Sequence, residues 1–324
     1  MFIQLSVNED VVQKKILLTG ATGFVGSVLL KKIEASNLVI LGRKSPDNYN
    51  GIFHKLEIDG DTDFSTALQE IDAIVHCAAR AHIMNDEVAD PLAEYRRVNV
   101  NGTLNLAQQA ADAGVKRFIY ISSIKVNGES TSGTVPFAAD DLSKPLDPYG
   151  VSKFEAEEGL KKIAAEVGMV VVIIRPPLVY GPGVKANFLN LLKLSATKLP
   201  LPFGAIKNKR SMVYLDNLVD LIVTCIDHPD AGNKVFLASD GDDLSLSRLL
   251  RLIRKSMNKP AWLLPVPAFV FKLAGKLMGK SDVVDRLIGD LQVDISDSKK
   301  HLNWTPPYTV EQGIKATVDD LMEK

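Results

Sequence analysis

Three glycines, Gly20, Gly23 and Gly26, directly follow the apolar run 15–19 and precede a stretch with helical periodicity. A glycine-rich turn between a strand and a helix lets the backbone approach a pyrophosphate, and the amino end of the helix then faces the phosphate charges. Gly26 in particular permits tight packing of the helix on the strand. This turn, near the start of a series of βα units, predicts a dinucleotide-binding fold. Cofactor contacts are expected from Gly20, Thr22, Gly23, Phe24, Val25 and Gly26.

Short β-branched apolar runs alternate with longer helical patterns over the first 175 residues. This rhythm is typical of a parallel sheet that is covered on both faces. Strands are expected at 15–19, 38–41, 54–58, 73–78, 118–122 and 170–175. Helices are expected at 25–35, at about 91–113 and at about 148–167. The sequence therefore predicts an α/β fold with a doubly wound parallel sheet of the Rossmann type.

Beyond Arg175 prolines become frequent and the apolar runs become short and separated. This change predicts a smaller, less regular α/β domain that binds the substrate. We expect residues 1–175 to form the NAD(P)-binding domain, joined by part of 211–238, and residues 176–324 to form mainly the substrate-binding domain.

Composition excludes several classes of function. The formal net charge is −1, which gives no sign of a nucleic-acid partner. The two cysteines, Cys77 and Cys225, favour a reducing, cytoplasmic location, and the scattered histidines predict no metal site. No apolar run reaches the roughly 18 residues of a membrane span, and Asn8, Glu9 and Asp10 interrupt any export signal.

Tyr149 and Lys153 lie four residues apart at the start of a predicted helix, with Pro148 suited to its first turn. Residues at i and i+4 share one helix face, so the phenol and the ammonium point into one space. A nearby cation favours phenolate over phenol, whose ordinary pKa is about 10. The pair therefore predicts that Tyr149 transfers a proton near neutral pH.

The motifs together resemble those of the extended short-chain dehydrogenase/reductase family, specifically its NAD-dependent epimerase/dehydratase members related to UDP-glucose 4-epimerase. TGATGFVG (19–26) resembles the family's glycine turn, and YGVSK (149–153) its YxxxK pair. HCAA (76–79) and NVNGT (99–103) resemble its HxAA and NVxGT segments. The resemblance extends from about residue 14 to 175 with the same motif order and spacing.

This resemblance implies particular site residues. SSIKVNG (122–128) is similar to the family pattern SSxxVYG, which makes Ser123 the catalytic hydroxyl beside Tyr149 and Lys153. Ser123 is expected to hydrogen-bond the sugar oxygen that becomes a carbonyl, with Ser122 as a second substrate contact. Further implied cofactor contacts are Asp59, which would touch adenine, Ala78, Ala79, Asn99, Tyr149 and Lys153.

The second half resembles the sugar-nucleotide enzymes of that family. RPPLVYGPG (175–183) is similar to their RPxxVYGPG signature, and Asn187 and Arg210 match residues that contact the substrate diphosphate. A diphosphate requires cations and amide donors, so these residue types suit it. The resemblance implies a UDP-sugar substrate, a role in bacterial surface polysaccharide biosynthesis and a homodimer.

Departures from the family pattern narrow the reaction. Dehydratases carry Asp-Glu after the catalytic hydroxyl, where this chain has Ile124 and Lys125, so a 4,6-dehydratase is not expected. Asn127 replaces the tyrosine of VYG, which leaves the shape of the sugar pocket open. Two reactions at the sugar C4 remain. One is reduction of a UDP-4-keto-(6-deoxy)-N-acetylhexosamine, and the other is 4-epimerisation of a UDP-hexose or UDP-N-acetylhexosamine with retained NAD.

The end of the second strand bears on this choice. An acidic side chain there would hold the ribose hydroxyl of NAD, but the sequence has Gly42 followed by Arg43 and Lys44. The guanidinium of Arg43 suits a 2′-phosphate. The sequence therefore favours NADP(H) over NAD, and with it the reductase over the epimerase.

Two alternatives of other kinds stay open. One is a non-catalytic cofactor-sensing protein of the same fold, and the other is a reductase of a small carbonyl compound without a nucleotide. Lys272, Lys276 and Lys280 also form a stripe on the predicted helix 269–280. We interpret this stripe as the solvated face of a core-packed helix in preference to a membrane contact.

Overall fold

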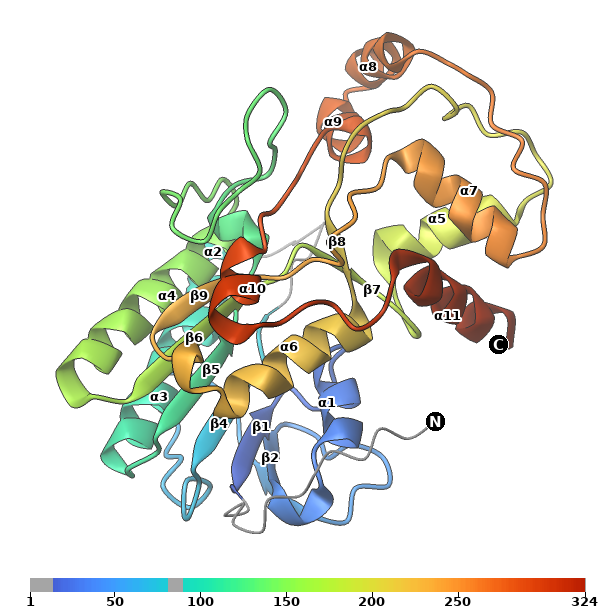
Figure 1. The fold of residues 1–324 in the computed structure, drawn as a ribbon. Coiled ribbons are helices and arrows are strands. Elements are labelled where there is room, and N and C mark those ends of the chain that lie inside the picture. The colour runs from blue at the N-terminus through green and yellow to red at the C-terminus, as the bar shows by residue number, and fades with distance from the viewer. Residues whose placement is uncertain (1–13, 81–89, 324) are drawn as a thin grey trace.

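The computed structural model describes residues 14–80 and 90–323, and helices cover both faces of its central sheet (Figure 1). All seven strands are parallel, in the order β3-β2-β1-β4-β5-β6-β9. They are β1 (Ile16–Thr19), β2 (Leu38–Gly42), β3 (Ile52–Lys55), β4 (Ala73–His76), β5 (Arg117–Ile121), β6 (Val170–Arg175) and β9 (Lys234–Leu237). The strand order reverses between β1 and β4, which is where ligands bind in sheets of this kind.

Each strand contributes side chains to both faces of the sheet. Leu18 packs on one face in a cluster with α1 (Gly26–Lys32) and α6 (Leu215–Asp227). Leu17 packs on the other face with α3 (Thr103–Asp112) and α4 (Pro148–Val167). Since both faces are covered, the inner strands β1, β2 and β4 are almost continuously apolar and buried instead of alternating, whereas the edge strand β3 has exposed ends. The predicted doubly wound α/β fold is confirmed.

Several predicted boundaries differ from those in the structure. Strand β3 begins and ends earlier than the predicted 54–58. The predicted helix 91–113 comprises α2 (Pro91–Tyr95), a π-helical segment at 96–102 and then α3. The seventh strand, β9, was not among the six predicted strands. It has only four residues, so its strand conformation depends on pairing with β6, with Val172 opposite Lys234.

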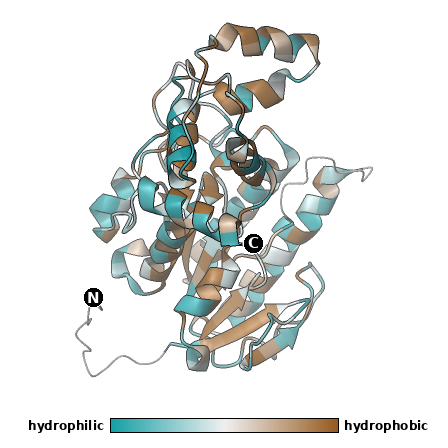
Figure 2. Ribbon diagram, turned by 90° about the vertical axis from the view of Figure 1, so that its right-hand side faces the viewer, coloured by the Kyte–Doolittle hydropathy of each residue, from teal (hydrophilic) through white to brown (hydrophobic). Residues whose placement is uncertain are grey.

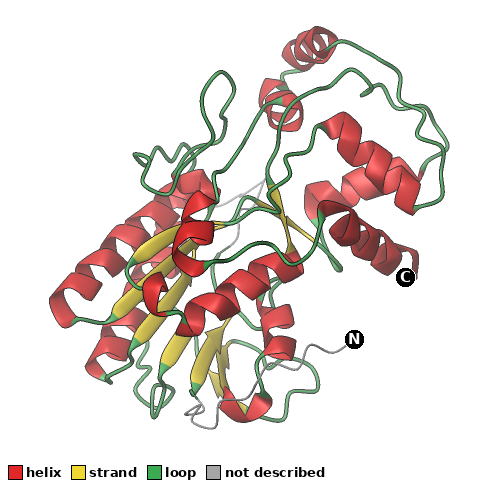
Figure 3. Ribbon diagram, viewed as in Figure 1, coloured by secondary structure: helices red, strands yellow, loops and turns green. Residues whose placement is uncertain are grey.

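The second half of the chain forms a mainly helical layer beyond the carboxyl ends of the strands (Figures 1 and 3). Its core surrounds a short parallel pair, β7 (Leu178–Tyr180) and β8 (Met212–Tyr214). The helices of this layer are α5 (Ala186–Ala196), α7 (Leu246–Ser256), α8 (Ala268–Leu277), α9 (Ser281–Ile288) and α11 (Val310–Glu323). In contrast, α10 (Ser296–Leu302) packs beside β9, and its Leu302 belongs to the core of the central sheet. None of the helices in residues 14–80 and 90–323 has both the length and the apolar content that a bilayer span requires.

Candidate active site

The glycine turn lies between β1 and α1 and leaves no room for side chains. Gly20 has φ +72°, and a Cβ atom added there would lie 2.7 Å from the backbone nitrogen of Ala78. The Gly23 amide donates to the Gly20 carbonyl at 2.9 Å, and a Cβ on Gly26 would lie 2.1 Å from that same carbonyl oxygen. The turn is therefore packed against the segment after β4 that was predicted to line the cofactor. This cradle, with the amino end of α1 next to it, fits a dinucleotide diphosphate.

Gly26→Ala is expected to disrupt this turn. The added methyl group meets rigid backbone, so we expect about 1–3 kcal/mol of lost stability and at least tenfold weaker binding of NADH. Urea unfolding and NADH fluorescence titration measure the two effects. Gly42→Ala is the matched stability control, because nothing lies within 4 Å of a Cβ there. Unchanged NADH affinity in Gly26→Ala would contradict this role of the turn.

Buried hydrogen bonds hold the strand ends around the turn. His76 lies between two threonine hydroxyls, with Nδ1 2.9 Å from Thr19 Oγ1 and Nε2 3.0 Å from Thr103 Oγ1. Burial lowers the pKa of His76 to about 3, so the ring is neutral. Asn99 accepts from the Arg80 amide at 2.8 Å and donates to Ser152 Oγ at 3.0 Å. Asn99 thus ties the segment after β4 to α4.

The predicted catalytic pair, Tyr149 and Lys153, lies at the start of α4. Asp147 caps this helix by accepting from the Gly150 amide at 2.6 Å, with proline in the first turn. Lys153 is buried and donates from Nζ to the Ile121 carbonyl at the end of β5, at 2.8 Å. Its Nζ lies 4.5 Å from the centroid of the Tyr120 ring and 6.0 Å from that of the Tyr149 ring.

The electrostatics of the pair differ from the sequence expectation. Burial raises the pKa of Tyr149 above its ordinary value, with smaller contributions from Asp147 and Tyr95, whose ring packs edge-on at 5.9 Å. The expected lowering of the Tyr149 pKa is therefore wrong for the chain alone, because desolvation outweighs a cation about 6 Å from the ring. Burial also lowers the pKa of Lys153 to about 8, so this ammonium still carries most of its charge at pH 7.

The depressed Lys153 pKa predicts how stability varies with pH. Between pH 8 and 10.5 the unfolded chain binds more protons at this site than the folded chain, so stability rises with pH in that window. In urea unfolding, wild type should gain about 2 kcal/mol relative to Lys153→Met between pH 7.5 and 9.5. Lys162→Met, at a 76% exposed side chain of the same helix, should show no such difference. Parallel pH profiles for wild type and Lys153→Met would contradict the shift.

The two adjacent serines have different environments. Ser123 is half-buried and accepts from the Lys125 amide at 3.3 Å, so it caps the short 3₁₀ turn 124–126. That turn contacts α4, since a Cβ on Gly150 would lie 3.0 Å from the Lys125 carbonyl oxygen. Ser122 is buried and donates to the carboxylate of Glu157. The prediction that Ser122 contacts the substrate is therefore wrong, because its hydroxyl belongs to a buried hydrogen-bond network.

That network was not found from sequence. Glu157 forms a bidentate ion pair with Arg175, with Nη2 to Oε2 at 2.6 Å and Nε to Oε1 at 3.0 Å. Both side chains are almost fully buried. Asn127 is also buried and accepts from Arg175 Nη1 at 3.0 Å, so the replacement of the family's tyrosine provides a structural contact here. The signal available in the sequence was spacing, since Glu157 follows Lys153 by four residues on the same helix face.

The basic residues predicted to select NADP(H) follow β2, and Asp59, predicted to contact adenine, follows β3. Arg43 and Lys44 are exposed. Asp59 Oδ1 accepts from the backbone and hydroxyl of Thr62, at 2.9 and 2.7 Å, which lowers the pKa of this carboxyl and fixes the loop after β3.

The predicted diphosphate residues lie in the second half of the fold. Arg210 is half-buried and donates from Nη1 to the Gly289 carbonyl at 3.3 Å. Burial removes water from its guanidinium and lowers the pKa of this group. A bound anion would compensate for the lost hydration of the cation. Asn187 is exposed in the first turn of α5. Arg286, a residue of α9, lies 3.6 Å from the Glu129 carboxylate.

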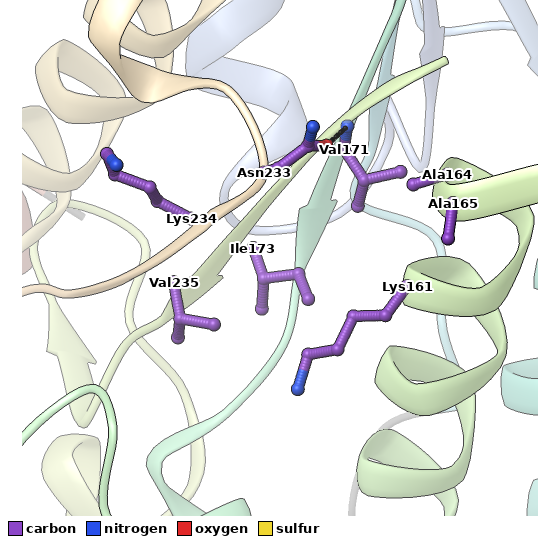
Figure 4. A pocket seen from close by; sticks show the side chains of 8 residues that line it. All are labelled: Lys161, Ala164, Ala165, Val171, Ile173, Asn233, Lys234 and Val235. Atoms are coloured by element: carbon purple, nitrogen blue, oxygen red, sulfur yellow. Dashed lines mark hydrogen bonds between the residues drawn. The ribbon is translucent and has the colours of Figure 1, made fainter. Parts of the chain in front are cut away.

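A separate cavity of about 290 Å³ lies between α4 and strands β6 and β9 (Figure 4). Lys161 extends across it from α4, while Val171, Ile173 and Val235 form an apolar wall. None of the residues that line it belongs to the catalytic or cofactor sets. Sheets of this kind bind ligands at the carboxyl ends of their strands, where Ser123 lies. The cavity is therefore not part of the active site.

Comparisons with known proteins agree with this fold. The NAD dependent epimerase/dehydratase family matches residues 16–238. A UDP-glucose 4-epimerase of Vibrio cholerae is 53% identical over 96% of both chains. An N-acetyl-α-D-glucosaminyl-diphospho-ditrans,octacis-undecaprenol 4-epimerase of Escherichia coli O157:H7 is 31% identical over 94% of both chains.

Among solved structures, a UDP-glucuronic acid 4-epimerase of Bacillus cereus, in complex with NAD, has the same fold. Its TM-score is 0.76 at 23% identity, covering 95% of this chain and 99% of that one. The comparisons support enzymes of the extended short-chain dehydrogenase/reductase type, and they do not support a non-catalytic sensor. The chain belongs to the NAD-dependent epimerase/dehydratase family.

Proposed function

We propose that this chain is an NAD-dependent 4-epimerase of hexoses or N-acetylhexosamines linked to a diphosphate. The observation that carries the proposal is the arrangement at the end of β5. There the Lys153 ammonium is fixed on the Ile121 carbonyl, 6.0 Å from the Tyr149 ring. The identity of 53% to a UDP-glucose 4-epimerase over nearly the whole chain supports the same reaction.

In the proposed mechanism Tyr149 removes the proton from the C4 hydroxyl of the sugar. Ser123 hydrogen-bonds the same oxygen, and the Lys153 cation stabilises the tyrosinate. Bound nicotinamide supplies hydride acceptance and return at C4. After the keto sugar presents its other face, Tyr149 returns the proton to the oxygen, which gives the C4 epimer.

Arg210 and Asn187 are proposed to bind the diphosphate of the substrate. Both lie beyond Arg175, in keeping with a substrate-binding role for residues 176–324. A diphosphate is common to UDP-sugars and to the lipid-diphosphate sugar in the name of the Escherichia coli relative. The proposed reaction at C4 is therefore the same whether the diphosphate carries uridine or a lipid at its other end.

A second candidate is an NADP(H)-dependent reductase of a 4-keto sugar. Arg43 and Lys44, which follow Gly42, favour this candidate because they suit a 2′-phosphate. The purified enzyme is incubated with UDP-glucose or UDP-N-acetylglucosamine, and in a second reaction with a UDP-4-keto sugar and NADPH, and the sugars and the nicotinamide absorbance are followed together. We expect interconversion of the C4 epimers without net change of cofactor. NADPH oxidation matched one-for-one by reduced 4-keto sugar, with no interconversion, would replace the epimerase by the reductase.

Gly42→Asp is expected to strengthen the preference for NAD. The position is open, so a carboxylate fits there and can accept from the ribose hydroxyl while repelling a 2′-phosphate. We expect the ratio of NADPH to NADH dissociation constants to rise at least tenfold, as measured by fluorescence titration. An unchanged ratio would mean that the end of β2 does not contact the ribose.

A further inference from the structure

Helix α8 presents apolar side chains to solvent along most of its length. Phe269, Leu273 and Leu277 are 68, 57 and 80% exposed, and Met278, just after the helix, is 67% exposed. On the adjacent α9, Val283 is 62% exposed. Figure 2 shows brown, apolar positions along this helix pair at the top of the molecule.

Within residues 14–80 and 90–323, only a narrow strip of α8 is covered by other parts of the fold. The Phe271 ring stacks on the Phe203 ring at 5.2 Å. Gly275 is buried, and a Cβ there would lie 2.7 Å from Val284 of α9. The interpretation of 269–280 as a core-packed helix is therefore wrong, since Leu273 and Leu277 lie outside the core together with the lysines.

The same surface is basic. Lys272, Lys276 and Lys280 are exposed, and α8 itself contains no acidic residue. Residues 267–288 contain four basic and two acidic residues, in a chain whose net charge is −1. We call this surface, formed by Phe269, Val270, Lys272, Leu273, Lys276, Leu277, Met278, Lys280 and Val283, the α8–α9 cap.

The combination of apolar and basic side chains determines what kind of surface fits the cap. Exposed Phe and Leu next to lysines are typical of helices that lie in the interface of an anionic bilayer. A second copy of the chain fits less well, since a two-fold contact would bring the three lysines of the cap against the same three lysines.

The cap adjoins the proposed diphosphate site. Gly289, the residue after α9, accepts through its carbonyl from Arg210. Val283, the residue of the cap nearest in sequence, precedes Gly289 by six residues, which is about 9 Å along the helix axis. Arg286 of α9 also pairs with Glu129, which lies 3.3 Å from Lys125 on the 3₁₀ turn after Ser123.

We propose that the α8–α9 cap docks on an anionic bilayer and thereby presents the Arg210 end of the site to sugar diphosphates on a membrane-held polyprenyl chain. The docking rests on the exposed residues of the cap alone, whereas the substrate class rests on the proposed 4-epimerase function. The relative named for an undecaprenyl-linked sugar is consistent with the substrate class.

Docking is tested by co-sedimentation of the full chain with vesicles. Wild type should bind phosphatidylglycerol/phosphatidylethanolamine vesicles, with weaker binding to pure phosphatidylcholine and at high salt. Two double variants should each bind at least tenfold more weakly than wild type. One is Leu273→Asp/Leu277→Asp, and the other is Lys272→Glu/Lys276→Glu. Met322→Asp, at a 62% exposed residue of α11, is the matched control and should bind like wild type.

Absence of wild-type binding, or equal binding by the cap variants, would overturn docking. Analytical ultracentrifugation tests the alternative that a second copy of the chain covers the α8–α9 cap. A wild-type dimer that the Leu273→Asp/Leu277→Asp change converts to monomer, without vesicle binding, would make the cap an interface between two copies.

Activity assays separate this inference from the proposed function. The cap variants should epimerise a water-soluble UDP-sugar like wild type, and should lose at least tenfold activity on a polyprenyl-diphosphate sugar in phosphatidylglycerol vesicles. Equal activity of wild type and cap variants on the vesicle substrate would overturn the substrate class. Vesicle binding without epimerisation of either sugar would overturn the 4-epimerase proposal and leave docking intact.

Discussion

Tyr149→Phe is expected to lower the turnover number by a factor of about 10²–10⁴ while NADH still binds. The variant lacks the only atom that the proposed mechanism uses to move the proton of the C4 hydroxyl. The ring itself stays, so its edge-on contact with Tyr95 and its place near Lys153 are kept. Initial rates of sugar interconversion and NADH fluorescence titration measure the two properties.

Tyr308→Phe is the matched control, because this ring is 39% exposed and packs on Tyr214, away from Lys153. It should keep wild-type turnover. Retention of more than a tenth of the turnover by Tyr149→Phe would rule out this residue as the acid and base. Loss of NADH binding in the same variant would mean that the Tyr149 hydroxyl is required for cofactor binding, so the lost turnover would not report on proton transfer.

Arg175→Met is expected to lower the free energy of unfolding by about 3–5 kcal/mol, since it leaves the buried Glu157 carboxylate without its cation. The double variant Glu157→Leu/Arg175→Met should be more stable than Arg175→Met, because it removes the uncompensated charge as well. Urea unfolding of wild type, the single variants and the double variant gives the coupling between the two side chains.

The exposed ion pair Arg96–Glu155 supplies the control on the same helix. Its side chains are 47 and 29% exposed, so Arg96→Met should cost less than about 1 kcal/mol. A loss below about 1 kcal/mol for Arg175→Met would mean that water reaches the Glu157 carboxylate.

The fold was predictable because its signals are local and repeated. Local signals specify β6 and α4 within a few residues. They are the apolar run of β6 and, for α4, the capping Asp147, the proline of the first turn and the apolar positions. Both elements have the predicted bounds. Strand β9 lacked such a signal, because it lies outside the alternating strand and helix series of the first 175 residues and pairs with β6, about sixty residues back along the chain.

The candidate site was predictable where chemistry requires fixed spacing. The intervals among Gly20, Gly23 and Gly26, and between Tyr149 and Lys153, are visible in the sequence alone. The assignment of these residues to catalysis and cofactor binding stays a prediction that the variants above test. The preference for NADP(H) is not supported, since the matching family is described as NAD dependent and the Bacillus cereus structure is a complex with NAD.

By itself the sequence determined the family, the doubly wound sheet and the positions of the glycine turn and the YxxxK pair, since each depends on neighbours within a few residues. Only the tertiary structure decided which serine faces the core, how Glu157 meets Arg175, and that burial sets the pKa of Tyr149 and Lys153. It also decided that Leu273 and Leu277 face solvent. The physical reason is that burial, and the desolvation that follows from it, depend on which distant segments cover a side chain, and periodicity along one helix does not contain that information.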